Sequence, residues 1–283
     1  MLTRLNNSWE LMKASLRVLM ADKELVIFPI VSGLGVLVVT LTFALPMLLS
    51  NFFDRALFGG QVQAAGLVVA FLFYLVQYTV IFFANTALVG AAMIRLRGGD
   101  PTVSDGFRIA SSRMGPILGY ALIAATVGMI LRALSSRSRG LGRLVVSIIG
   151  FAWNVATYLV VPVLAVENVG PVEAIKRSTG LLKRTWGEQI AGHLGLGAIF
   201  FLAYLAEVIV CIPVFFLGIY YQSAVLIVGA VLLLVLLLAV TGLVQSTLEG
   251  IYSAAVYQYA TTGQAGTFFD EQLVRRAFTP ALT

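Results

Sequence analysis

Glu207 is the residue whose type and position most directly suggest chemistry in this sequence. It lies deep within the apolar segment 190–219, with apolar neighbours on both sides. An ionised carboxylate is costly in hydrocarbon unless it is paired or becomes protonated. The functional interpretation is therefore a proton or cation site, or a counter-charge for docking. The structural interpretation is a carboxyl that is neutral or paired with an arginine.

Arg132 and Arg143 are the arginines that we expect opposite Glu207. They lie at the two ends of a short arginine-rich turn between the apolar segments 115–134 and 144–166. In the topology that the charges favour, as described below, this turn and Glu207 both lie toward the outer face of the membrane. The sequence therefore predicts an ion pair between Glu207 and Arg132 or Arg143.

Three further polar side chains lie within apolar segments, namely Gln77, Asn85 and Asn154. Such groups seek hydrogen-bond partners within a helix bundle, and we expect that role for them, with a substrate path as the alternative. Arg137 and Arg139 lie in the arginine-rich turn itself. They either contact anionic lipid or an acidic partner on the outer face, or are merely solvated.

Catalytic and metal chemistry have little support. The chain has one histidine, His193, so it offers no site with two histidines, and we interpret His193 as an interfacial capping residue. The single cysteine, Cys211, lies in an apolar run and is expected to be a buried small side chain. Glu249, near the inner end of the last apolar segment, is expected to be solvated. We assign no catalytic residue, no metal ligand and no cofactor, and expect a protein that is not an enzyme.

The composition is that of an integral membrane protein. The chain has 283 residues, of which 59% are hydrophobic and only 11% charged, whereas soluble domains carry roughly 25% charged residues. Apolar runs long enough to cross a bilayer recur along the chain. The sequence predicts a single all-α domain, residues 1–283, with six transmembrane helices over about 25–50, 62–94, 115–134, 144–166, 190–219 and 224–259.

Amphipathic segments precede the first, third and fifth of these spans, at residues 5–20, 103–114 and 171–187. In the third of them, apolar residues recur with the helical period and form one stripe, namely Val172, Ile175, Thr179, Leu182 and Trp186. Such a helix is expected to lie in the membrane interface with its stripe toward the lipid.

The distribution of positive charge predicts the orientation. With the N-terminus inside, 14 of the 19 Lys and Arg residues lie on the N-terminal side of the membrane and 5 on the other. Cytoplasmic loops carry the excess of Lys and Arg, so both termini and all three amphipathic segments are expected to be cytoplasmic. The net charge of +6 is accordingly attributed to contact with anionic lipid, and nucleic acid is not expected as a partner.

The segment 161–186 resembles a recurrent motif of bacterial six-span membrane proteins, including the membrane domain found with some glycerophosphodiester phosphodiesterases. Its pattern is Pro-x-x-x-x-Glu followed by Gly-Pro-x-Glu-Ala-Ile-x-Arg-Ser-x-x-Leu-x-Lys. The motif positions, with the aromatic residue that follows, are Pro162, Glu167, Gly170, Glu173, Arg177, Ser178, Lys183 and Trp186. The resemblance implies an uncharacterised protein of the bacterial inner membrane. It carries over no phosphodiesterase activity, because that domain is absent here.

Two functions compete. The first is a non-catalytic membrane scaffold or accessory subunit that docks a partner or lipids through its cytoplasmic interfacial helices. The second is a transporter or permease for a small or lipid-like substrate that uses Glu207. Transport favours several inward charges and helices broken at matched places, whereas only Glu207 lies deep here. We therefore favour the scaffold, with anionic membrane lipids and a membrane-protein partner or a second copy of the chain as partners. The motif is expected to hold its helix to neighbouring helices, with a partner-binding surface as the alternative.

Overall fold

The computed structural model describes residues 2–49, 64–138, 140–184, 189–264 and 268–269, and every element in this part of the chain is helical. Six of its helical segments are long and apolar enough to span a membrane, which confirms the expected multi-pass class. The elements are α1 (Leu2–Ala21), η1 (Lys23–Val26), α2 (Ile27–Leu49), α4 (Ala64–Leu96), α5 (Val103–Ser112), α6 (Met114–Arg137), α7 (Leu141–Thr157), α8 (Val160–Val166), α9 (Pro171–Arg184), α10 (Gln189–Tyr220) and α11 (Ala224–Thr262).

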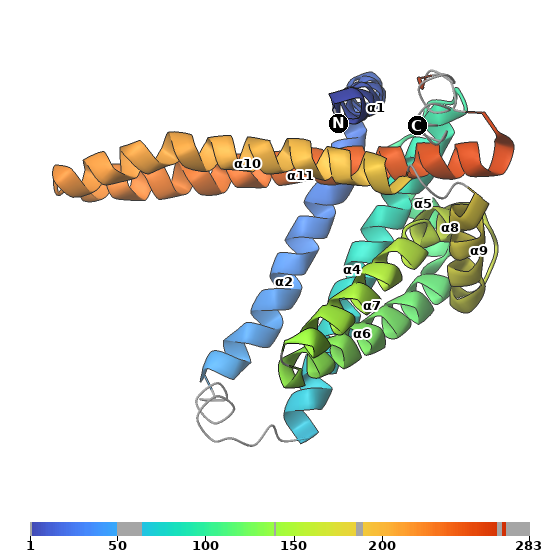
Figure 1. Cartoon of the computed structure of the whole chain (residues 1–283), viewed down its shortest axis with the longest axis horizontal. Coiled ribbons are helices and arrows are strands. Elements are labelled where there is room, and N and C mark those ends of the chain that lie inside the picture. Colours follow the sequence, from blue (N-terminus) through green and yellow to red (C-terminus); the bar gives the residue numbers. More distant parts are fainter. Residues whose placement is uncertain (1, 50–63, 139, 185–188, 265–267, 270–283) are drawn as a thin grey trace.

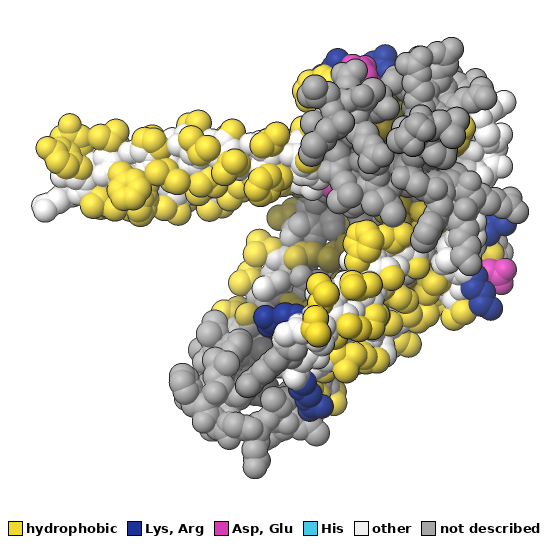
Figure 2. All heavy atoms as spheres, viewed as in Figure 1, with side chains coloured by type: hydrophobic (Ala, Val, Ile, Leu, Met, Phe, Trp, Pro, Cys, Tyr) yellow, Lys and Arg dark blue, Asp and Glu magenta, His cyan; other side chains and the backbone are white. Residues whose placement is uncertain are grey.

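Four of the spans run alongside one another, and the remaining two lie across them. Figure 1 shows α2, α4, α6 and α7 as one group, while α10 and α11 form a long hairpin that crosses one end of this group. Hydropathy predicts six spans, but it says nothing about this crosswise placement. The tip of the hairpin projects beyond the group, and apolar side chains cover it in Figure 2.

The C-terminal half of α11 anchors the hairpin to α4. A Cβ added at Gly250 would lie 2.9 Å from Leu88 Cγ, so only glycine allows this close approach without a shift of the leucine. Leu248, Ile251 and Tyr252 are buried in the core that α11 shares with α4. The segment expected to be the end of the sixth span is therefore the most deeply packed part of the hairpin.

The helices α1, α5 and α9, which we call the cap helices, lie at the end of the spans where α2 begins and α4 ends. They correspond to the three amphipathic segments, and in α9 the buried face matches the expected stripe only in part, because Leu182 of the stripe is buried. In α9 the buried residues include Ala174 and Ser178, whereas Val172 of the expected stripe is 56% exposed. In α1, Ala14, Ser15 and Val18 are buried. The buried small side chains of α1 and α9 lie against neighbouring helices of the protein, which they can approach closely.

The expected fourth span is two helices rather than one. The helix breaks at Tyr158 and Leu159, between α7 and α8. Pro162 explains the position of the break, because a proline has no N–H to donate to the carbonyl four residues earlier and its ring clashes with that carbonyl. Residue 158 is four residues before Pro162, so the regular hydrogen bonding of the helix cannot pass through this point.

Candidate functional site

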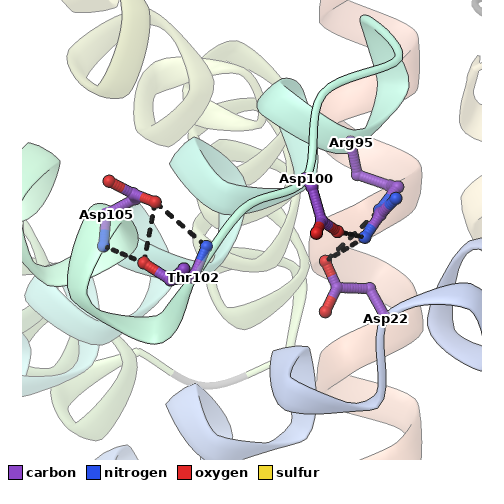
Figure 3. Close-up of polar contacts among 5 residues, drawn as sticks. All are labelled: Asp22, Arg95, Asp100, Thr102 and Asp105. Carbon is purple, nitrogen blue, oxygen red and sulfur yellow. Dashed lines mark hydrogen bonds and ion pairs between the residues drawn. The ribbon is translucent and has the colours of Figure 1, made fainter.

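Arg95, at the end of α4, forms ion pairs with two carboxylates at the cap end of the structure, those of Asp22 and Asp100 (Figure 3). Its Nε and Nη2 atoms donate to Asp22 Oδ2, both at 3.4 Å, and Nη2 also donates to Asp100. The side chains of Arg95 and Asp22 are 18% and 6% exposed, whereas that of Asp100 is 91% exposed. Burial raises the pKa of the Asp22 carboxyl, and the Arg95 guanidinium opposes that rise. This cluster ties the junction of α1 and η1 to α4.

Thr102 and Asp105 start the second cap helix, α5, with reciprocal hydrogen bonds (Figure 3). Asp105 Oδ2 accepts from the Thr102 backbone N–H at 3.0 Å and from the Thr102 hydroxyl at 2.7 Å, while Thr102 Oγ1 accepts from the Asp105 N–H at 3.2 Å. This capping box satisfies amides that a helix otherwise leaves unpaired. The hydrogen bonds from Thr102 lower the pKa of the Asp105 carboxyl, and Arg108 adds to this effect.

Ser178 of α9 bonds directly to the break between α7 and α8. Its hydroxyl donates to the Ala156 carbonyl at 2.8 Å and accepts from the Leu159 N–H at 3.1 Å, and the side chain is fully buried. In an unbroken helix the N–H of Leu159 would bond to the carbonyl of residue 155. Ser178 therefore supplies the backbone partners that the break before Pro162 removes. Pro162 and Ser178, both residues of the sequence motif, therefore act together: the proline breaks the helix and the serine pairs the backbone groups at the break.

Glu167 connects the same region to the last helix. Its Oε1 atom accepts from the Tyr257 hydroxyl of α11 at 2.8 Å and from Arg177 Nε of α9 at 3.2 Å. The neighbouring Asn168 accepts from Arg113, which precedes α6. The connection between α8 and α9 is thus tied to α6, α9 and α11. This supports the interpretation that the motif holds its helix to neighbouring helices.

The outer face of α9 borders a polar groove against α11. The groove has a volume of about 320 Å³, and its polar lining comes mostly from exposed side chains on one face of α9. It is lined by Glu173, Lys176, Arg177, Gly180, Leu181, Ala260 and Thr261. Gly170, another motif residue, lies before the first turn of α9, where its carbonyl accepts from the Ala174 N–H at 2.9 Å. Trp186 lies outside the described residues, as does the side chain of Lys183.

The predicted ion pair between Glu207 and Arg132 or Arg143 is wrong. Glu207 Oε1 instead accepts a hydrogen bond from Thr241 of α11, and Arg132 Nη1 donates to the Tyr74 hydroxyl of α4 at 2.7 Å. The reason is the placement of the hairpin, because α10 projects away from the far ends of α6 and α7, where the arginines lie. Glu207 Oε2 is buried and has no hydrogen-bond partner among the described residues.

Sequence reasoning missed the partners of the two hairpin carboxylates. Tyr204 donates to Gln245 Oε1 at 2.8 Å, and Gln245 Nε2 donates to Glu249 Oε1 at 2.8 Å. Glu249 is therefore hydrogen-bonded within the hairpin rather than only solvated. A signal was present, because Thr241, Gln245 and Glu249 recur every four residues where the long apolar run of α11 ends. That spacing places all three on one face of α11.

The other polar residues singled out from the sequence lie apart. Asn154 lines a cavity of about 360 Å³ between α4, α6 and α7, with aromatic side chains around it. Gln77 Oε1 is buried without a hydrogen-bond partner in the described part of the chain, and Asn85 is half-buried. Arg137 and Arg143 are exposed, whereas Arg139 lies outside the described residues. Cys211 is buried, as expected, and the side chain of His193 lies outside the described part.

Comparison with known proteins identifies a family but no activity. Residues 64–268 match the family described as "Family of unknown function (DUF6159)". The match begins in α4 and extends past the end of α11, so it includes the break between α7 and α8 and the whole hairpin. No curated protein matches the chain. The expected membership in a family of unknown function is thereby confirmed. The resemblance to the membrane domain found with glycerophosphodiester phosphodiesterases stays a prediction.

Proposed function

The chain belongs to the DUF6159 family of unknown function, and we propose that it acts as a non-catalytic membrane scaffold or accessory subunit. The cap helices α1, α5 and α9 lie on the cytoplasmic side of a bacterial inner membrane and dock a membrane-protein partner, with anionic lipid around them. This orientation rests on the excess of Lys and Arg in the segments on that side of the membrane. The bacterial inner membrane rests on the resemblance of the segment 161–186.

The observation that carries this proposal is the way the cap helices are fixed. Arg95 holds the end of α1, Thr102 and Asp105 fix the start of α5, and Ser178 fastens α9 to the broken span. The polar side chains of these residues form hydrogen bonds and ion pairs between or within helices and do not form a reactive site. A helix held at its buried face presents its outer face in a defined position, which reduces the ordering cost of binding.

The groove between α9 and α11 is the best-defined docking surface on the cap. Lys176 and Glu173 are exposed beside each other there, one turn apart, and they offer charges of both signs to a partner. Charged groups at the rim of an interface govern partner choice and association rate more than affinity. The partner is accordingly expected to carry complementary charges on a small projecting element.

Purification from native membranes in mild detergent tests the proposal. A protein that co-purifies in fixed ratio with the wild type is expected to be depleted at least about tenfold by Lys176→Glu, which reverses a groove charge. Arg143→Glu is the matched control, because it reverses an exposed charge outside the groove. A protein that purifies alone, or equal depletion by both variants, would contradict the docking role.

A transporter remains the second candidate, favoured by one observation. Glu207 Oε2 is buried without a hydrogen-bond partner among the described residues, and Glu249 lies farther along the same hairpin. A carboxylate oxygen without a protein partner inside a membrane helix is a candidate ligand for a transported cation. Reconstitution into liposomes tests this function through ion-driven uptake. The transport hypothesis requires uptake that Glu207→Gln abolishes, and equal uptake by both proteins would rule it out.

A further inference from the structure

A large cavity lies between α2, α4 and α6, toward the ends of these helices remote from the cap. Its volume is about 710 Å³, within the usual range of small-molecule sites, about 300–1,000 Å³. α2 and α6 each pack on α4, so α4 lies between them and contributes one wall of the cavity. The cavity is lined by Thr40, Phe43, Ala44, Leu67, Ala70, Phe73, Tyr74, Met129, Arg132, Ala133, Ser136 and Arg137.

The lining is mostly apolar and includes two cations, Arg132 and Arg137. Phe43 of α2 and Phe73 of α4 meet edge to face, with ring centroids 5.5 Å apart, and Tyr74 continues this aromatic surface. Both arginines come from the last turns of α6. Arg137 lies at the end of the helix, and Arg132 lies about 7.5 Å deeper along the axis at the normal helical rise. The cations therefore lie at two depths beside an apolar wall.

Arg132 is held in place without being neutralised. The Tyr74 hydroxyl accepts one of its hydrogen bonds at 2.7 Å, which leaves further guanidinium donors for a ligand. Neither Arg132 nor Arg137 forms an ion pair within the described residues. A cation on a membrane-spanning helix normally pairs with a negative charge. The structure thus presents an oriented cationic group that lacks a protein counter-ion in this part of the chain.

We propose that this cavity binds one anionic phospholipid, with its phosphate on Arg132 and Arg137 and an acyl chain along Phe43, Phe73 and Ala70. The guanidinium fork matches phosphate oxygens with two parallel hydrogen bonds. The aromatic and aliphatic wall supplies the hydrophobic surface for the acyl chain. Because the cavity lies at the end remote from the cap helices, this lipid site is independent of the proposed docking role.

Native mass spectrometry of the detergent-purified protein tests the site with phosphatidylglycerol and phosphatidylcholine as probes. The wild type is expected to retain phosphatidylglycerol at least about tenfold more tightly than phosphatidylcholine. The double variant Arg132→Gln/Arg137→Gln should lose that preference. Arg143→Gln, which removes an exposed arginine of α7 that does not line the cavity, should keep it. Ala70→Phe should weaken binding of phosphatidylglycerol with both arginines intact, which reports on the acyl contact and not on charge.

Three results would overturn the proposal. The first is equal retention of the two lipids by the wild type. The second is an equal loss of preference in Arg143→Gln, which would indicate general attraction of anionic lipid to positive charge. The third is displacement of the bound lipid by millimolar inorganic phosphate, which would indicate an anion site without lipid recognition. Size-exclusion profiles that match the wild type show that each variant is folded.

Discussion

Ser178 accepts a hydrogen bond from the backbone N–H of Leu159 at 3.1 Å, and this contact joins α9 to the break between α7 and α8. The amide of Leu159 loses its normal helical partner because Pro162 interrupts the helix just after it. The serine hydroxyl also donates to the Ala156 carbonyl at 2.8 Å. A single buried side chain therefore completes a broken membrane helix and fixes the position of a cap helix.

Ser178→Ala is expected to reduce the free energy of unfolding by about 1–3 kcal/mol, because it leaves buried backbone groups without partners. Pro162→Ala should reduce that cost, since a continuous helix can again pair the Leu159 amide internally. Thermal unfolding of the two single variants and the double variant in detergent measures this coupling. Ser104→Ala, at an exposed position of α5, is the control. Additive effects of the two substitutions would show that the serine does not compensate for the proline.

Arg95→Gln is expected to destabilise the protein by about 2–3 kcal/mol, because it leaves the buried Asp22 carboxylate without its cation. This range lies below the cost for a fully buried pair, since the Arg95 side chain is 18% exposed. Asp100→Asn removes the other, exposed carboxylate of the cluster and should cost no more than about 0.5 kcal/mol. Chemical unfolding of both variants compares them directly. Equal destabilisation by Arg95→Gln and Asp100→Asn would show that the ion pair with Asp22 does not account for the stabilising effect of Arg95.

The lowered pKa of the Asp105 carboxyl leads us to expect a loss of stability in acid. Its folded-state pKa is below the ordinary value of 3.8, so its stabilisation is complete above pH 3.8 and is lost as the pH falls toward the folded-state pKa. Asp105→Asn should flatten the dependence of the melting temperature on pH in this acid range. Asp100→Asn serves as the control for removing an exposed carboxylate at the same end. Identical acid slopes for the wild type and Asp105→Asn would contradict the capping role.

Glu207 is expected to be coupled energetically to Thr241 and not to Arg132. A double-mutant cycle of Glu207→Leu with Thr241→Val should give a non-additive term, because Thr241 donates a hydrogen bond to Glu207 and each substitution removes it. The same cycle with Arg132→Gln should be additive within about 0.5 kcal/mol, since separated sites act independently. Thermal unfolding in detergent supplies both measurements. A clear coupling between Glu207 and Arg132 would restore the ion pair that the sequence suggested.

Elements that depend on local pattern were predictable from the sequence, and contacts between distant elements were not. Long apolar runs located the spans, because bilayer thickness dictates their length. Hydropathy does not specify which spans are neighbours, so the expected pair of Glu207 and Arg132 was plausible by depth alone. The crosswise hairpin meets α4 where Gly250 approaches Leu88 closely, and these residues lie far apart in the chain.

The buried faces of the cap helices were also not predictable from the local sequence pattern. In α9 the apolar stripe adjoins the small residues Ala174 and Ser178, and either set can form the contact face. The structure buries Ala174 and Ser178, and it leaves Val172 exposed. Small side chains carry little hydrophobic signal, so a search for apolar periodicity overlooks them. The motif indicated that residues 161–186 act together, but the hydrogen bonds from Ser178 required the path of the chain in space.

Photo-cross-linking in native membranes tests the docking role most directly. A benzoylphenylalanine placed at Glu173 lies in the groove between α9 and α11, and one placed at Leu236 lies on the exposed hairpin. Irradiation is expected to give one defined protein adduct from position 173 that is absent from position 236. The absence of a protein adduct at position 173, or the same adducts from both positions, would contradict a docking surface on the cap helices.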